Sequence, residues 1–196
     1  MGGEKRDLLW SNHRRGEHEM VSKTKEKLAE AFKTVVCKKS FTKTTIADIT
    51  KECGMTRENF YYHFRDKYDI LGWVCRHQLV ANIPEKYDKK YVEDLIIYLV
   101  RKINEDYKFY RTVVRDVGVE QVRKEVLPYI LKLIYRLIDE TIDENVWRMR
   151  EEKENFAVDF FSDAFITFLT EYMLENEKMD EKLTVMNFHF LFTQFF

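Results

Sequence analysis

The stretch that decides the fold of this 196-residue chain is residues 44–64, TTIADITKECGMTRENFYYHF. Thr44 is a suitable N-cap for a short helix, and Gly54 ends that helix because glycine readily takes the left-handed conformation. Thr56 then caps a second short helix that reaches Phe64. Two short helices joined by a glycine-containing turn are what a helix-turn-helix requires, with the second helix presented to the major groove of DNA.

The side chains of these two helices separate into an apolar and a polar set. Ile49, Met55 and Phe60 are predicted to form the shared core, and the small Ala47 is expected where the two helices cross. The exposed side keeps groups that can bond to phosphates or to base edges. These groups belong to Thr56, Arg57, Asn59, Tyr61, Tyr62 and His63.

The flanking sequence also reads as helices. Apolar residues at helical spacing predict a helix over residues 22–38, and Asp66 is a suitable cap for another over 67–82. The same spacing predicts further helices over 91–104, 107–117, 119–142, 152–176 and 182–196. Six glycines and two prolines are too few for the turns of a sheet protein of this length. The predicted fold class is all-α.

Charge and cysteine content restrict the function classes. The net charge is −1, yet residues 20–70 carry eleven basic and seven acidic side chains, whereas residues 71–196 carry 18 and 23. A basic segment before an acidic one suits a nucleic-acid-binding head on a larger body. Cys37, Cys53 and Cys75 form no CxxC pair, which is typical of a reducing compartment. No membrane-spanning stretch or signal peptide is visible, so we expect a cytoplasmic protein.

Residues 41–71, FTKTTIADITKECGMTRENFYYHFRDKYDIL, resemble the DNA-binding domain of the TetR family of regulators. The matching features are Thr44–Thr45–Ile46, Gly54, the aromatic run Phe60–Phe64, Lys67 and Leu71. The rest of the chain resembles the branch of this family typified by dihydroxyacetone-kinase regulators. The features that carry this second resemblance are Trp73, residues 107–111 (YKFYR), and Phe160–Phe161 before Phe168–Leu169.

The resemblance implies a domain organisation and a function. Residues 1–19 are interpreted as a flexible arm or a cloning extension, residues 20–66 as the three-helix helix-turn-helix domain, and residues 67–196 as a helical ligand-binding and dimerisation domain. A cytoplasmic homodimer would then bind a palindromic operator in double-stranded DNA. It would act as a repressor that an unknown small-molecule effector releases or modulates. The resemblance implies no cofactor.

Roles for individual residues follow from the same resemblance. Thr45 is expected at the start of the second helix near a phosphate, while Arg57 and Asn59 are expected to touch bases. Backbone phosphates are the expected partners of Thr56, Tyr61, Tyr62, His63 and Lys67. Glu58 departs from the family, which usually has a small residue there. An acid in the groove repels phosphate unless it accepts a hydrogen bond from a cytosine amino group.

The larger domain is expected to provide a dimer interface and a ligand pocket. The last two predicted helices are apolar over more surface than one core contact needs, which favours pairing with a second subunit. The candidate interface residues are Phe161, Phe165, Phe168, Tyr172, Phe188 and Phe192. The family implies a pocket, for which the candidate lining residues are Tyr91, Tyr98, Tyr107, Tyr110, Tyr129 and Trp147. Residue by residue, each of these aromatics is more often an ordinary core or surface side chain.

Two other classes of protein compete with this interpretation. An enzyme is not favoured, because the sequence has no HExxH, no glycine-rich phosphate loop and no nucleophile beside an obvious base. No metal site is expected at His63, which lacks a second ligand at helical spacing. A co-regulator of the same fold, which binds a partner protein rather than DNA, stays open because of Glu58 and the modest charge bias.

Overall fold

The computed structural model describes residues 23–80, 92–139 and 151–195. Within these ranges the chain consists of helices and short connections without a strand, which confirms the all-α class. An N-terminal helix over residues 23–39 comes first. It is followed by α2 (Ile46–Cys53), α3 (Arg57–His63), α4 (Lys67–Cys75), a π-helix (Arg76–Val80), α5 (Val92–Glu105), α6 (Tyr107–Asp139), α8 (Glu151–Glu175) and α9 (Glu181–Phe195). Residues 1–19, Tyr91 and Trp147 lie outside the described ranges.

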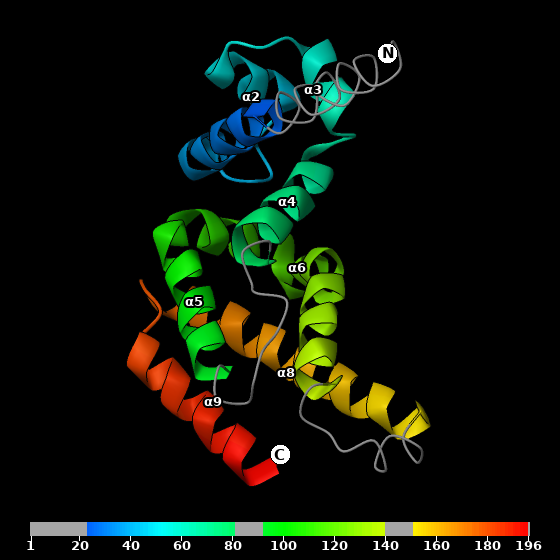
Figure 1. Ribbon diagram of the computed structural model, residues 1–196. Coiled ribbons are helices and arrows are strands. Elements are labelled where there is room, and N and C mark those ends of the chain that lie inside the picture. Colours follow the sequence, from blue (N-terminus) through cyan, green and yellow to red (C-terminus); the bar gives the residue numbers. More distant parts are fainter. Residues whose placement is uncertain (1–22, 81–91, 140–150, 196) are drawn as a thin grey trace, which may run out of the picture.

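The helices form a small head and a larger body. The N-terminal helix, α2 and α3 make up the head at one end of the molecule, and α4 leads from it toward the body (Figure 1). In the body, α6 packs against α8 and α5 packs against α9. Among the described residues, no helix is long and apolar enough to cross a bilayer.

Aromatic side chains form the core of the head. Phe32, Phe41 and Phe60 are completely buried. The ring centroid of Phe32 lies 6.1 Å from that of Phe41 and 5.6 Å from that of Phe109 in α6. Burial of one such side chain contributes on the order of 1.5–3 kcal/mol to folding. Because Phe32 contacts both head and body, the two share one apolar core.

Two irregularities interrupt the long helices. Gly118, with φ 77° and ψ 164°, breaks α6, which confirms the predicted division into a helix over 107–117 and another from residue 119. The predicted helix over 67–82 is not α-helical throughout, because α4 ends at Cys75 and the chain continues as the π-helix. A π-helix has i→i+5 hydrogen bonds and often marks a functional position.

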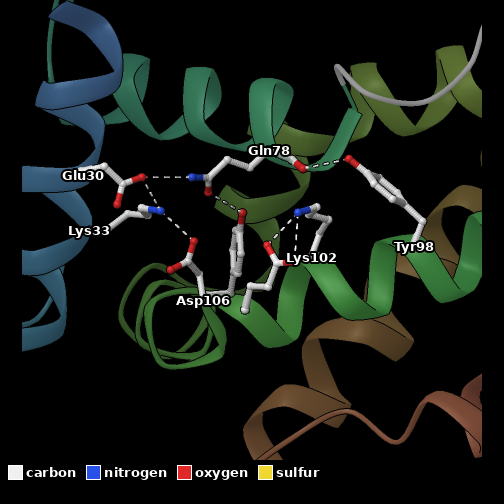
Figure 2. A network of polar contacts seen from close by, with 8 residues as sticks. Glu30, Lys33, Gln78, Tyr98, Lys102 and Asp106 are labelled. Carbon is white, nitrogen blue, oxygen red and sulfur yellow. Dashed lines mark hydrogen bonds and ion pairs between the residues drawn. The ribbon is translucent and has the colours of Figure 1, made fainter. Parts of the chain in front are cut away.

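A partly buried ion pair joins the N-terminal helix to the body, with Lys33 buried and its acidic partners more exposed. Lys33 Nζ lies 2.7 Å from Asp106 Oδ2 and 2.7 Å from Glu30 Oε1, and only 9% of the Lys33 side chain is exposed. Burial lowers the pKa of Lys33, but the hydrogen bonds it donates to Asp106 and Glu30 outweigh burial and raise that pKa above its usual value. Figure 2 shows the three side chains converging between the N-terminal helix and the start of α6.

A second polar contact joins the loop before α2 to the bend in α6. The Phe41 N–H donates to Asp116 Oδ2 at 2.6 Å, and Arg115 Nε donates to Asp116 Oδ1 at 3.1 Å. Asp116 is nearly buried, with 10% of its side chain exposed, whereas Arg115 is exposed. The head is therefore held to the body by one polar contact just before α6, at Asp106, and by another just before Gly118, at Asp116.

Candidate nucleic-acid interface

The first helix of the helix-turn-helix, α2, begins with a capping box. Its N-cap is Thr45, whose Oγ1 accepts from the Asp48 N–H at 3.2 Å while the Thr45 N–H donates to Asp48 Oδ2 at 3.2 Å. Thr44, the predicted cap, is instead buried and donates its hydroxyl to the Ser40 carbonyl at 2.7 Å. A capping box needs a suitable side chain three residues after the cap, and Asp48 has that spacing from Thr45 only.

Asp48 also links α2 to the N-terminal helix. Lys39 Nζ donates to Asp48 Oδ1 at 2.5 Å. This hydrogen bond, followed by those from Thr45, lowers the pKa of Asp48 to about 2. Ala47 is exposed, so the prediction that it lies at the helix crossing is wrong. The inward face of α2 is formed by its neighbours Ile49 and Thr50, which are both buried.

The turn between α2 and α3 depends on Gly54. Its φ of 67° and ψ of 34° are left-handed, a conformation that costs an L-residue with a Cβ about 1–2 kcal/mol. In this conformation the Gly54 N–H donates to the Lys51 carbonyl at 3.3 Å, and the Met55 N–H donates to the Thr50 carbonyl at 2.8 Å. These bonds end α2 and direct the chain into α3, as the sequence predicted.

The second helix, α3, is fixed on one face and exposed on the other. Thr56 caps it as predicted, with Thr56 Oγ1 accepting from the Asn59 N–H at 3.2 Å. Phe60 and Phe64 are buried beneath it with ring centroids 5.8 Å apart. By contrast, 58% of Tyr61 and 78% of Tyr62 are exposed. The helix therefore presents two aromatic hydroxyl groups outward from a rigid support.

The eight residues predicted to touch DNA do not all lie in the same environment. Six of them are exposed on the head: Thr45, Thr56, Arg57, Asn59, Tyr61 and Tyr62. His63 is half-buried, and burial together with the charge of Lys25 lowers its pKa. Lys67 is also half-buried, because its Nζ donates to the carbonyls of Phe41 at 3.0 Å and Thr42 at 3.3 Å. Lys67 thus connects the start of α4 to the loop before α2.

Two lysines of the helix-turn-helix and the loop before it were not singled out by the sequence analysis but are exposed and unpaired within the described part of the chain. Lys43, in the loop before α2, and Lys51, in the last turn of α2, are exposed. Among the described residues neither forms a salt bridge, whereas Lys38 and Lys39 pair with acidic side chains of α2. Free cations at these positions can bind phosphate. Only the structure separates these lysines from the paired ones.

The described tyrosines of the predicted pocket make contacts within the chain. Tyr110 is buried and its Oη donates to Gln78 Oε1 at 3.2 Å, while Tyr98 Oη donates to the Gln78 carbonyl at 3.4 Å (Figure 2). Tyr107 Oη donates to the Asn176 carbonyl at 2.9 Å, at the end of α8. The side chain of Tyr129 lies outside the described part of the structure, like Tyr91 and Trp147. Tyr98 and Tyr110 thus meet at one residue of the π-helix.

The described aromatics of the predicted dimer interface pack between α8 and α9. The ring centroid of Phe188 lies 5.0 Å from that of Phe165 and 5.7 Å from that of Phe168. Phe168 also contacts Tyr172, with ring centroids 5.8 Å apart. All four side chains stay partly exposed. The side chains of Phe161 and Phe192 are outside the described set.

Comparison with known families matches both parts of the chain. A family described as "Bacterial regulatory proteins, tetR family" matches residues 35–72, which contain α2 and α3. A second, described as "Transcriptional regulator C-terminal region", matches residues 90–194. The matched residues cover the helix-turn-helix and nearly all of the body.

Individual proteins give more distant matches. The HTH-type dhaKLM operon transcriptional activator DhaS of Lactococcus lactis subsp. lactis (strain IL1403) is 22% identical over 90 residues. That match covers 46% of this chain and about half, 48%, of the relative. Among solved structures, the dihydroxyacetone kinase operon activator DhaS has 18% identity and a TM-score of 0.63, covering 87% of this chain and 95% of that one. The fatty acid degradation regulator FadR from Bacillus halodurans has 18% identity and a TM-score of 0.58, covering 85% and 93%. Both structures share the fold.

Proposed function

Because this chain belongs to the TetR family of bacterial regulatory proteins, we propose that it binds double-stranded DNA through α2 and α3. The observation that carries the proposal is the outward face of α3. Phe60 and Phe64 hold this helix on the core while Tyr61, Tyr62 and neighbouring polar side chains face away from it. A rigidly supported helix with exposed polar groups is what entry into the major groove requires.

The proposed contacts divide between bases and phosphates. Arg57 and Asn59 are assigned to base edges, where a guanidinium group recognises guanine and an amide group recognises adenine. Phosphates are assigned to Thr45, Thr56, Tyr61, Tyr62 and His63, and we add Lys43 and Lys51. Lys67 is assigned a supporting role in addition to phosphate binding, because it holds the loop that precedes α2. Phosphate contacts position the head, and base contacts select the sequence.

The rest of the chain is proposed to pair and regulate two such heads. We assign residues 20–66 to DNA binding and residues 67–196 to ligand binding and dimerisation. A cytoplasmic homodimer, paired through the aromatic residues of α8 and α9, would place two heads on the half-sites of a palindromic operator. A small molecule held in the body would change the relative position of the heads and release or modulate binding. The resulting regulation is proposed to be repression.

A second candidate function is supported by one observation. Glu58 is exposed on the outward face of α3, where a negative charge opposes phosphate binding. A co-regulator that uses the same face, with Tyr61 and Tyr62, to bind a partner protein would have no such conflict. The two functions predict different binding behaviour. A DNA-binding regulator binds a DNA duplex with an affinity that falls steeply as salt rises, whereas a co-regulator binds its partner protein without DNA.

Selection from a random pool of DNA duplexes tests the proposal. The purified full chain should recover one palindromic sequence, and affinity for it should fall steeply with salt because bound phosphates release counterions. Transcription in vitro from a promoter that carries this sequence should then decrease on addition of the protein. An increase would identify an activator, which is what the name of the Lactococcus lactis relative states for that protein. Recovery of no sequence above background would favour the co-regulator.

A further inference from the structure

The helical phase of α3 decides which of its side chains face the floor of a groove. Successive residues of an α-helix are about 100° apart, so a residue two positions away from another lies nearly opposite to it. Glu58 and Tyr62 are each two positions from the fully buried Phe60. They are also four residues apart from each other, and therefore lie on the same face. Glu58 and Tyr62 form the central line of the exposed face.

The neighbours of Glu58 occupy the flanks of that face. Arg57 is three residues before Phe60 and is therefore about 60° from the buried direction. Asn59 directly precedes Phe60 and is about 100° from it. When the N-terminal end of this face enters the major groove, Glu58 is central and lies nearest the floor. Arg57 and Asn59 on its two sides can still reach base edges, and Tyr62, one turn farther along, can reach a phosphate. Glu58 is thus directed at base edges, although its charge would be unfavourable at a phosphate.

The chemistry of a carboxylate restricts the base that it can meet. Hydrogen bonds from its own backbone N–H and then from the Thr56 hydroxyl lower the pKa of Glu58, so the group is ionised at neutral pH and only accepts hydrogen bonds. In the major groove guanine offers two acceptors, and thymine offers an acceptor and a methyl group. Adenine has one amino donor beside the N7 acceptor, which repels the second carboxylate oxygen. Cytosine presents an amino donor without that neighbouring acceptor.

We propose that Glu58 is a specificity-determining residue, which accepts a hydrogen bond from the N4 amino group of a cytosine in each operator half-site. The inference rests on the proposed DNA-binding function and deepens it. Its consequence is a C·G pair required at one position of the half-site, together with weak tolerance of other bases there. At a wrong base pair the carboxylate loses its donor and stays buried in the groove as an unpaired charge.

The test compares sequence selection by the wild-type chain, Glu58→Ala and Glu58→Gln. Wild type should select cytosine at one position of each half-site, and Glu58→Ala should lose the preference there while keeping every other position. The affinity of Glu58→Ala for the wild-type operator should fall on the order of ten- to a hundred-fold, which is the usual effect of losing one good base contact. For an operator in which this C·G pair is replaced, Glu58→Ala should bind as tightly as wild type or more tightly, because the variant has no carboxylate to repel the other base. Glu58→Gln should accept adenine, which pairs with an amide.

A modified operator isolates the single hydrogen bond. Replacing the selected cytosine by a pyrimidinone without the 4-amino group should weaken wild-type binding and leave Glu58→Ala unaffected. Glu177→Gln removes the same charge from the exposed turn between α8 and α9 and serves as the matched control, with wild-type selection expected. Thermal unfolding of each variant verifies that it is folded.

Three results would overturn the inference. If Glu58→Ala is less stable but selects the same cytosine, Glu58 only stabilises the start of α3, and DNA binding stands without it. If wild type selects a palindrome in which the position affected by Glu58→Ala is not cytosine, the assigned base is wrong. If wild type selects no sequence at all, the proposed DNA-binding function fails and the assignment of Glu58 fails with it.

Discussion

Asp48 shows how one side chain can organise the start of a DNA-binding motif. It closes the capping box with Thr45 and accepts a hydrogen bond from Lys39 of the N-terminal helix. Both partners stabilise the ionised carboxylate, which explains its lowered pKa. The stability of the first turn of α2 therefore depends on the charge of Asp48, whose capping partner Thr45 is a proposed phosphate contact.

This coupling predicts a dependence of stability on pH. The pKa of Asp48 is about 2 in the folded protein, whereas an unfolded chain has a value of about 4. The contribution of Asp48 is therefore complete above about pH 4 and is lost as pH falls through about 2. Urea unfolding of Asp48→Asn across this range should show lower stability than wild type at neutral pH and a shallower decline in acid. Lys39→Met should show part of the same change, and superimposable curves for wild type and Asp48→Asn would contradict the prediction.

The sequence identified the apolar residues of the site more reliably than the polar ones. Phe60 was predicted to be in the core because aromatic burial follows from helical spacing alone. Thr44 and Thr45 are both good N-caps, and only the spacing to Asp48 selects Thr45. The contacts of Lys67 could not be predicted, because its acceptors are carbonyl groups of a loop about 25 residues earlier in the chain, brought close by folding.

At the scale of elements, α6 illustrates what helical periodicity can and cannot predict. The division of α6 at Gly118 was visible in the sequence, because the pattern changes on either side of a glycine. The π-helix after α4 was not, since its hydrogen bonds depend on how Gln78 and its neighbours pack against other helices. Helix ends agree within one residue in α5, where the amphipathic pattern is strong, and also in α9, which is apolar on more than one face.

The segment of α6 before Gly118 leads to a prediction for Asp116. Asp116→Ala should destabilise the protein by about 1–3 kcal/mol, the cost of leaving the Phe41 N–H without an acceptor in a mostly buried position. Asp116→Asn keeps an acceptor and should cost less. Arg115→Ala removes the exposed partner of the same carboxylate and should change stability by less than about 0.5 kcal/mol. Equal losses in urea unfolding for Asp116→Ala and Arg115→Ala would show that the bond to Phe41 contributes little.

At the scale of the whole molecule, the buried Lys33 predicts how head and body depend on each other. Lys33→Met fills a similar volume but leaves Asp106 without its cation, so stability should fall by about 1.5–3 kcal/mol. Adding Asp106→Asn to this variant should restore part of the loss, because the unpaired charge is removed. Glu30→Gln removes the more exposed partner and should have a smaller effect. Chemical unfolding of the four proteins measures these differences, and no recovery in the double variant would contradict the explanation.

The described aromatic residues predicted to line the ligand pocket and the dimer interface also make contacts within the chain. Tyr98, Tyr107 and Tyr110 were grouped by composition as pocket residues, yet their hydroxyl groups bond to the π-helix and to the end of α8. Phe165, Phe168 and Phe188 pack α8 against α9 within the chain and keep part of their surface exposed. The aromatic content of a sequence does not distinguish these uses, because each depends on contacts between distant segments.

The π-helix restricts changes in the number of residues between α4 and Gln78. The Gln78 side chain donates to Glu30 of the head and accepts from Tyr110 of the body. Both hydrogen bonds therefore depend on the direction in which this side chain points. Deleting one residue between α4 and Gln78 would turn this side chain around the helix axis, away from Glu30 and Tyr110. Insertions and deletions are thus constrained at residues 76–78 even where substitutions are not. Homologues that differ in length here would lack the link that Gln78 makes between head and body, in addition to the contacts of Lys33 and Phe41.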